Sequence, residues 1–271
     1  MDGPQGGAAL TGAGLGVRGP RGWAFRGVGV DAAAGALVAV EGPSGSGRTC
    51  LLLALTGRMR LAAGTATVGG LDLPRRMAAV RRISALAHVP GVTDLDPALT
   101  VAEHLRERAL LQGRFDGGLR ALLRPRPERA ATARSRIDGA LAAAGLDPDS
   151  LPKGPRTAVR DLERVEALRL SLALALVGRP RLLGVDDTDL KLAEAERAEV
   201  WGQLRSLAQA GTTVVAVCSE APSDVDAVVT TAAPRAAVPA DSAPADGAPT
   251  GSDLTDTDEE TADALAEARR A

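Results

Sequence analysis

The sequence predicts an α/β protein with a mostly parallel sheet, because short apolar runs alternate along the chain with helical segments. Residues 36–40 have the apolar character of a buried strand, and residues 50–55 that of a buried helix. Further on, residues 182–185 and the β-branched run 212–218 are expected to be strands, separated by an amphipathic helix over 193–210. A length of 271 residues suits either one large domain or a domain with a tail.

Weaker signals lie between these segments, and we interpret them by the same rules. The expected elements are a first strand within residues 1–20, a strand at 25–30, a strand pair at 64–72, an apolar run at 80–89, and helices at 100–111 and 162–176. Thr100 and Glu103 form a capping box that begins the first of these helices. The region 115–160 is expected to be helical and broken at Pro125 and Pro127.

The turn between the strand at 36–40 and the helix at 50–55 matches the phosphate-binding pattern G-x-x-x-x-G-K-[ST] at every position except one. Its glycines let backbone N–H groups close around phosphate oxygens, and the helix N-terminus adds the positive end of its dipole. A chance Gly/Ser-rich turn is the alternative, but strand and helix flank this loop as a phosphate site requires. The predicted cofactor-binding residues are Gly42, Pro43, Ser44, Gly45, Ser46, Gly47, Arg48, Thr49 and Cys50.

The exceptional position is Arg48, which stands where the pattern has lysine. Lysine is a compact point charge, whereas the arginine guanidinium is longer, planar and forked, so the exchange is not conservative. Lysine occurs only at Lys153 and Lys191 in the whole chain, which indicates a general bias towards arginine. The hydroxyl of Thr49 is a predicted ligand of Mg²⁺.

Charge is distributed unevenly along the chain. From Asp241 to the end, nine acidic residues face two arginines, which gives a charge of −7. The Ala/Pro-rich composition of residues 232–271 predicts a disordered, solubilising or interacting tail. The main basic stretch consists of Arg106, Arg108, Arg114, Arg120, Arg124, Arg126, Arg129, Arg134 and Arg136. Because Phe115 is the only aromatic residue within this stretch of the sequence, base stacking is not indicated. We interpret the stretch as a solvated helical face, and no nucleic-acid partner is expected.

Cysteine content and hydropathy bear on the compartment. Cys50 and Cys218 both lie in apolar segments, and reduced thiols in an intracellular protein are expected. No apolar run approaches the ~20 residues that span a bilayer, and the N-terminus lacks a signal-peptide pattern. We therefore expect a cytoplasmic protein that reaches the inner face of the membrane through a partner.

Four further segments, in their order along the chain, resemble the ATP-binding cassette family, the nucleotide-binding domains of ABC transporters. They are residues 55–59 followed by 64–70, residues 96–105, residues 173–186 and residues 211–215. The resemblance covers roughly residues 10–230. It implies a P-loop NTPase fold with a mostly parallel sheet, a small antiparallel β subdomain and an α-helical subdomain at about 100–176. The cassette would occupy residues 1–231 and the acidic tail residues 232–271.

The resemblance also implies a site. Asp186 would join Thr49 as a ligand of Mg²⁺, ATP would bind with the metal, and Asp187 would take the place of the family's catalytic glutamate with a side chain one methylene shorter. In the family, two cassettes sandwich each ATP, and a cassette without membrane spans works with a separate transmembrane subunit. A homodimer or a heterodimer and such a membrane partner are therefore implied.

Several family positions are changed here. Gly91 stands for a glutamine, Glu163 for the serine of the L-S-G-G-Q signature, Ala193 for an aspartate and Ser219 for the switch histidine. Phosphoryl transfer depends on stabilising charge at the γ-phosphate and on a positioned water, so weak or lost hydrolysis is expected. Neither His88 nor His104 lies at the switch position. We expect both to be surface or packing residues.

Three functions are compatible with these observations. The first is an ATP-binding subunit of an ABC-type transporter or related membrane complex. The second is a non-catalytic regulatory or scaffold module with the same fold, which the altered motifs favour. The third is a small nucleotide kinase, against which the cassette-like segments argue. Whether Trp23 or Phe25 stacks on adenine is left open by their spacing.

Overall fold

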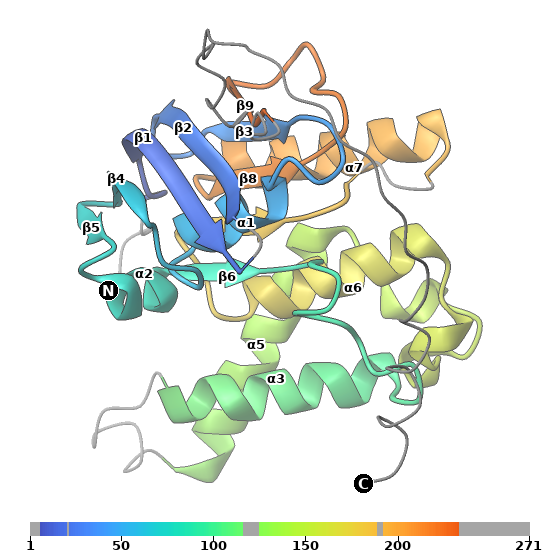
Figure 1. Ribbon diagram of the computed structural model, residues 1–271. Coiled ribbons are helices and arrows are strands. Elements are labelled where there is room, and N and C mark those ends of the chain that lie inside the picture. The colour runs from blue at the N-terminus through green and yellow to red at the C-terminus, as the bar shows by residue number, and fades with distance from the viewer. Residues whose placement is uncertain (1–5, 21, 116–124, 189–191, 233–271) are drawn as a thin grey trace, which may run out of the picture. The chain divides into compact units, whose positions relative to one another are not determined.

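A five-stranded parallel sheet lies at the centre of the residues that the computed structural model describes, namely 6–20, 22–115, 125–188 and 192–232. Its strand order is β6-β7-β8-β3-β9 (Figure 1). The strands are β3 (Leu37–Glu41), β6 (Ser84–Leu86), β7 (Leu182–Val185), β8 (Thr213–Val217) and β9 (Ala227–Thr230). The predicted α/β class with a mostly parallel sheet is confirmed.

A second, antiparallel sheet has the order β2-β1-β4-β5 in the described part of the chain. It consists of β1 (Leu10–Gly19), β2 (Gly22–Ala32), β4 (Ala63–Val68) and β5 (Leu71–Leu73). Leu10 of β1 lies between Ala32 of β2 and Val68 of β4 in the register. This sheet is the small antiparallel β subdomain that the family resemblance implies.

Helices flank the parallel sheet. Three of them, α3, α5 and α6, lie together below the sheet in Figure 1. The helices are α1 (Arg48–Leu55), α2 (Met77–Ile83), α3 (Val101–Phe115), α5 (Arg126–Ala144), α6 (Arg164–Leu176) and α7 (Glu194–Gln209), with 3₁₀ turns η1 (Pro148–Ser150), η2 (Gly154–Arg156) and η3 (Val159–Asp161). Within the described residues, no helix combines the length and apolar character needed to cross a bilayer.

Of the two prolines at which a helix was expected to break, Pro127 lies inside one instead. Pro125 is the N-cap of α5 and Pro127 lies in its first turn. Proline is tolerated there because the first helical N–H groups have no intrahelical acceptor, so the missing donor costs nothing. The helix then runs to Ala144 and ends at Gly145, which has a left-handed conformation.

Side chains of the parallel sheet alternate between two cores. On β3, Val38 and Val40 pack with α1 and the antiparallel sheet, whereas Leu37 and Ala39 pack with α6 and α7. This alternation follows from the two-residue period of a strand, whose successive side chains point to opposite faces. Because both faces of β3, β7 and β8 are covered, these strands are mainly apolar, as is usual for parallel sheets.

The helix α1 approaches β7 very closely. A Cβ atom at Gly184 would lie 2.9 Å from Leu52 Cδ1 and 2.8 Å from Leu86 Cδ2. Glycine at this position therefore lets α1, which carries the predicted phosphate loop at its N-terminus, sit directly against the sheet.

The predicted capping box of α3 is confirmed. The Thr100 N–H donates to Glu103 Oε2 at 2.8 Å, and the Glu103 N–H donates to Thr100 Oγ1 at 3.3 Å. The start of α3 is also bonded to the segment before α6, since the Val101 N–H donates to the Thr157 carbonyl and the Val159 N–H to the Leu99 carbonyl, both at 3.0 Å. These bonds connect the start of α3 to the turns that lead into α6.

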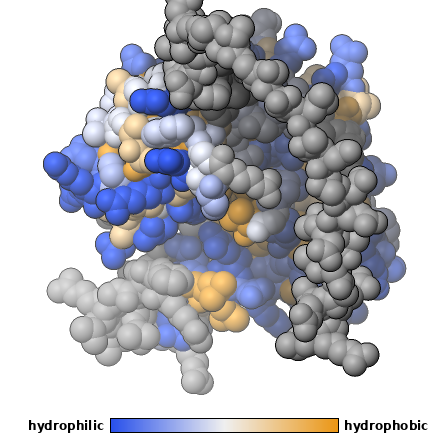
Figure 2. Space-filling view, in the orientation of Figure 1, coloured by the Kyte–Doolittle hydropathy of each residue, from blue (hydrophilic) through white to orange (hydrophobic). Residues whose placement is uncertain are grey.

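Replacing Leu183 of β7 with alanine should lower the free energy of unfolding by about 2–5 kcal/mol, because its fully buried side chain would leave a cavity in the core. The matched control is Leu110→Ala. Leu110 is 67% exposed on α3, where Figure 2 shows apolar surface, and its loss should change stability by at most about 0.5 kcal/mol. Chemical denaturation of both variants measures the difference, and equal effects would contradict this description of the core.

Candidate functional site

The predicted phosphate loop connects β3 to α1, and two of its glycines are required by their surroundings. Gly47 has φ 84° and a Cβ atom there would lie 2.6 Å from the Ala24 carbonyl oxygen of β2. Gly42 has φ 149° and a Cβ atom there would lie 2.4 Å from the Thr231 carbonyl oxygen. The loop is therefore enclosed by backbone from two other strands.

The N-terminus of α1 leaves backbone donors available. The Leu51 N–H donates to the Gly47 carbonyl at 2.9 Å, and Gly47 has no side chain that could cap the helix. The N–H groups of Arg48, Thr49 and Cys50 precede this first bond and have no acceptor within the helix. Together with the helix dipole, these donors form a site suited to an anion such as phosphate.

Thr49 lies beside Asp186, the residue that follows β7. Thr49 Oγ1 donates to Asp186 Oδ2 at 2.6 Å, and the Asp186 carboxylate is almost completely buried. Burial raises the pKa of Asp186, while the hydrogen bond from Thr49 acts in the opposite direction. A cation would therefore stabilise the charged carboxylate at this position.

The residues present fit Mg²⁺ in the manner that nucleotide sites use. Mg²⁺ prefers oxygen ligands and usually takes one or two from the protein, with water and phosphate oxygens completing the shell. Thr49 and Asp186 offer a hydroxyl and a carboxylate in direct contact. Within the described ranges, no group of three or more His, Cys, Asp or Glu side chains forms an all-protein cation site.

Arg48 is engaged with the main chain. Its Nη1 donates to the carbonyl oxygen of Cys218, directly after β8. Arg48 is also close enough to lower the pKa of Asp186, although this is the smallest of the effects on that carboxylate. The guanidinium thus interacts with the end of β8 in this structure.

Asp187, the candidate catalytic residue, has a left-handed backbone with φ 49°. Its N–H donates to Asp186 Oδ1 at 2.9 Å, and its side chain is half-buried. The next residue is fixed against β8, since the Thr188 N–H and Oγ1 both donate to the Val217 carbonyl, at 3.1 and 2.9 Å. The turn after β7 is therefore held from both sides of Asp187.

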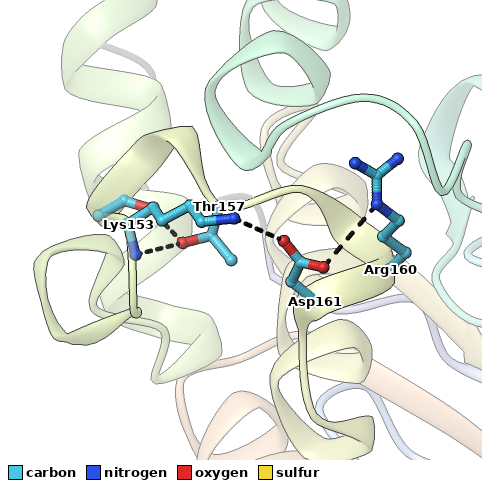
Figure 3. A network of polar contacts seen from close by, with 5 residues as sticks. Lys153, Thr157, Arg160 and Asp161 are labelled. Carbon is cyan, nitrogen blue, oxygen red and sulfur yellow. Dashed lines mark hydrogen bonds and ion pairs between the residues drawn. The ribbon is translucent and has the colours of Figure 1, made fainter.

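The segment before α6 contains the altered signature. Glu163 is the N-cap of α6 and forms a capping box with Glu166, whose Oε2 accepts from the Glu163 N–H at 2.8 Å. The helix N-terminus is therefore bonded to a carboxylate of its own chain. Figure 3 shows the preceding turn, where Asp161 accepts from Lys153 at 3.1 Å and lies 3.8 Å from Arg160 Nε.

Other altered positions lie in local turns. The Gly91 N–H donates to both carboxylate oxygens of Asp94, at 2.9 and 3.1 Å. The Ala193 N–H donates to Glu196 Oε2 at 2.7 Å at the start of α7. Ser219 is exposed, after β8. These bonds stabilise the turns themselves.

His104, Phe25 and Trp23 contact the surrounding protein. His104 is 9% exposed and its Nε2 lies 3.2 Å from the Asp96 carbonyl oxygen. Phe25 is fully buried in the core, so it is not accessible for stacking on adenine. The Trp23 ring lies 5.0 Å from the Arg26 guanidinium carbon, an arrangement typical of a cation–π contact.

Cys50 and Cys218 are not in a disulfide bond. Cys218 is buried as expected, whereas Cys50 is only half-buried because it lies in the first turn of α1 at the loop. Burial raises the pKa of Cys50, and the nearby Asp186 carboxylate acts in the same direction. The thiol form is favoured at this position.

Sequence reasoning missed one residue at the loop. Ser46 Oγ lies 2.6 Å from Thr231 Oγ1, and both side chains are fully buried. Thr231 follows an ordinary β-branched strand and is separated from Ser46 by 185 positions, so no local signal identifies it.

A glycine loop between a parallel strand and a helix, with Thr49 of that helix bonded to Asp186 after β7, defines a P-loop NTPase. The family model described as "ABC transporter" matches residues 25–189. The chain belongs to this family, as one of its ATP-binding domains.

The curated relatives are named for different processes. This chain is 31% identical over 174 residues to the Nod factor export ATP-binding protein I of Cupriavidus metallidurans, covering 64% of this chain and 50% of that protein. It is 33% identical over 195 residues to the daunorubicin resistance ATP-binding protein DrrA3 of Streptomyces coeruleorubidus, covering 71% and 54%. It is 34% identical over 215 residues to the Fe(3+) ions import ATP-binding protein FbpC of Streptomyces avermitilis, covering 78% and 56%. The chain spans about half the length of the curated relatives it matches.

Solved structures agree on the fold. A bacterial Atm1-family ABC exporter with ATP bound has a TM-score of 0.63 at 20% identity, covering 88% of this chain and 40% of that chain. A dimeric ATP-binding cassette in a post-hydrolysis state with ADP and Pi has a TM-score of 0.59 at 20% identity, covering 78% and 88%. At these identities the likeness shows the fold alone.

Replacing Gly47 with alanine should destabilise the protein more than the same change at Gly45. Both glycines have a left-handed backbone, with φ 84° and 78°, so both variants share a strain of about 1–2 kcal/mol. Only at Gly47 would the new Cβ meet backbone, whereas nothing lies within 4 Å at Gly45. Thermal unfolding of the two variants measures the difference, and equal losses would show that β2 does not constrain the loop.

Proposed function

We propose that this chain is an ATP-binding subunit of an ABC-type transporter or a related membrane complex, and that it binds MgATP at residues 42–50 with slow or lost hydrolysis. The observation that carries the proposal is the contact of Thr49 Oγ1 with Asp186 Oδ2 at 2.6 Å, beside the open N–H groups at the start of α1. A metal ligand pair and a phosphate site are thereby adjacent, as MgATP requires.

The loop residues fall into three groups by their role in this proposal. Gly42, Gly45 and Gly47 give the backbone its shape, Pro43, Ser44 and Ser46 contribute main chain, and Arg48, Thr49 and Cys50 contribute N–H donors. Thr49 and Asp186 would hold Mg²⁺, which would stabilise negative charge on the phosphates when bound. Asp187 would accept a proton from the attacking water, provided that its shorter carboxylate comes within hydrogen-bond distance.

Slow turnover follows from the charges around the loop. The guanidinium of Arg48 is bonded to Cys218, and it must leave this carbonyl before it can neutralise an outer phosphate. Glu163 places a carboxylate at the helix N-terminus that faces the γ-phosphate in family dimers. Gly91 and Ser219 lack the amide and the imidazole of the family pattern. Stabilisation of the transition state is therefore weakened at several points.

The remaining assignments belong to the same proposal. The cassette occupies residues 1–231, and the acidic tail at 232–271 is a separate segment that falls almost entirely outside the described residues. The partners are a separate transmembrane subunit and a second cassette, identical or related, without nucleic acid. The protein would work in the cytoplasm at the inner face of the membrane. Because the relatives are named for export, resistance and import, no transport direction is assigned.

A non-catalytic regulatory or scaffold module is the second candidate. It is favoured by the capping box that Glu163 and Glu166 form at the N-terminus of α6. Such a terminus already has an anionic partner and would repel a phosphate brought by a second cassette. This function would retain the fold and nucleotide sensing but not turnover.

Calorimetric titration tests the nucleotide site. Wild type should bind ATP saturably in the presence of Mg²⁺, and Thr49→Ala combined with Asp186→Ala should weaken binding at least about 100-fold, equivalent to about 2.7 kcal/mol. The matched control is Thr67→Ala with Asp72→Ala, which removes an exposed threonine–aspartate hydrogen bond of 3.4 Å between β4 and β5. If wild type does not bind at millimolar ATP, the loop is a structural remnant and the scaffold function leads.

Single-turnover cleavage of ATP tests the second candidate, because cleavage that depends on Asp187 would exclude a non-catalytic module. Arg48→Lys should raise the rate by about tenfold, or about 1.4 kcal/mol, because lysine restores a point charge at the phosphates. Asp187→Ala should abolish whatever cleavage wild type shows, and Asp94→Ala, in the turn of Gly91, is a control that should retain it. Cleavage that survives the loss of Asp187 would remove that residue from the reaction.

A further inference from the structure

Thr231 contacts the phosphate loop at both its beginning and its middle. The Thr231 N–H donates to the Glu41 carbonyl at 2.9 Å, and Thr231 Oγ1 lies 3.3 Å from the same carbonyl oxygen. Thr231 Oγ1 also lies 2.6 Å from Ser46 Oγ. A single residue at the end of β9 thus bridges the last residue of β3 and the loop itself.

These distances define a short chain of hydroxyl groups. Thr231 has one proton on its hydroxyl, and the Glu41 carbonyl can only accept, so Thr231 Oγ1 donates to Glu41 and accepts from Ser46 Oγ. Within the described residues, Thr231 is the hydrogen-bond partner of the Ser46 hydroxyl. Both side chains are fully buried, so loss of the bond would leave a polar group without water to replace its partner.

The backbone of Thr231 constrains the loop as well. Its carbonyl oxygen would lie 2.4 Å from a Cβ atom at Gly42, so the first glycine of the loop is pressed against the end of β9. β9 pairs in parallel with β3, with Glu41 opposite Thr230. Thr231 therefore extends this pairing by one residue, into the region where β3 becomes the loop.

We propose that Thr231 is a positioning residue of the nucleotide site. Its hydroxyl holds Ser46, and only Gly47 separates Ser46 from Arg48, the first of the residues whose N–H groups would bind phosphate. A rotation of Ser46 would turn the peptide units of Gly47 and Arg48 away from a common point, and convergence of these donors is what an anion site requires. This inference rests on the proposed function of the loop as a phosphate site.

The test combines Thr231→Val, which keeps the shape and removes the hydroxyl, with Thr231→Ser, which keeps the hydroxyl. Thr231→Val should weaken MgATP binding about fivefold, the worth of one hydrogen bond, and Thr231→Ser should bind like wild type. The control is Thr230→Val at the exposed neighbour, whose Oγ1 lies 3.3 Å from Glu41 Oε1. Calorimetry gives the affinities and thermal unfolding gives the stability of each variant.

A double-mutant cycle assigns the effect to the bond itself. Ser46→Ala should weaken binding as well, and Ser46→Ala with Thr231→Val should bind more tightly than Thr231→Val alone, because neither buried partner is then left unpaired. Should Thr231→Val fail to fold, Ser46→Ala removes the same bond from the other side. A lower melting temperature with unchanged MgATP affinity would overturn the proposal and leave Thr231 a purely structural residue.

Hydrogen exchange without nucleotide distinguishes this proposal from the proposed function. The Ser46 N–H, which donates to the Pro43 carbonyl at 3.1 Å, should exchange about fivefold faster in Thr231→Val than in wild type, whereas Thr231→Ser should keep the wild-type rate. If wild type does not bind MgATP, the proposed function fails, yet the exchange rates still decide whether Thr231 holds the loop. Unchanged rates in the loop would overturn the positioning role whatever the result of the binding experiment.

Discussion

The parallel pairing of β3, with β8 on one side and β9 on the other, is the constraint on which the site depends. Parallel strands place their carboxyl ends at one edge of the sheet, so the residues that follow them meet there. The phosphate loop follows β3, Cys218 follows β8 and Thr231 follows β9, while Asp186 follows β7. Segments that are more than 100 positions apart in the chain are thereby brought within hydrogen-bond distance of the loop.

Binding and turnover place different demands on this edge of the sheet, and the proposed function treats them separately. Binding a phosphate requires N–H donors in fixed positions, and the glycine backbone and the start of α1 supply these donors. Accelerating cleavage requires charge aimed at atoms that become more negative in the transition state. Here the Arg48 guanidinium is bonded to a main-chain carbonyl, and carboxylates lie at the N-terminus of α6. This asymmetry gives the physical reason to separate nucleotide binding from hydrolysis in the proposed function.

Local patterns predicted the elements well because each depends on neighbouring residues. The sequence predicts the glycine loop, its flanking strand and helix, and the capping box at Thr100. The predicted helix break at Pro127 is wrong because proline is compatible with the first turn of a helix. Asp186 was assigned from the family resemblance. The contact of Arg48 with Cys218 spans 170 positions and that of Ser46 with Thr231 spans 185, so neither has a local signature. The local sequence likewise does not show that Phe25 is buried in the core and therefore inaccessible to adenine.

Gly184 has a consequence for how such a protein can change over evolutionary time. The missing side chain sets the depth at which α1 rests on β7, and the tips of Leu52 and Leu86 fill the space. A larger residue at 184 would lift the helix, and the phosphate loop with it, unless one of these leucines became smaller at the same time. Substitutions at these three positions should therefore be inherited as compensating sets, although none of the three lies in the loop itself.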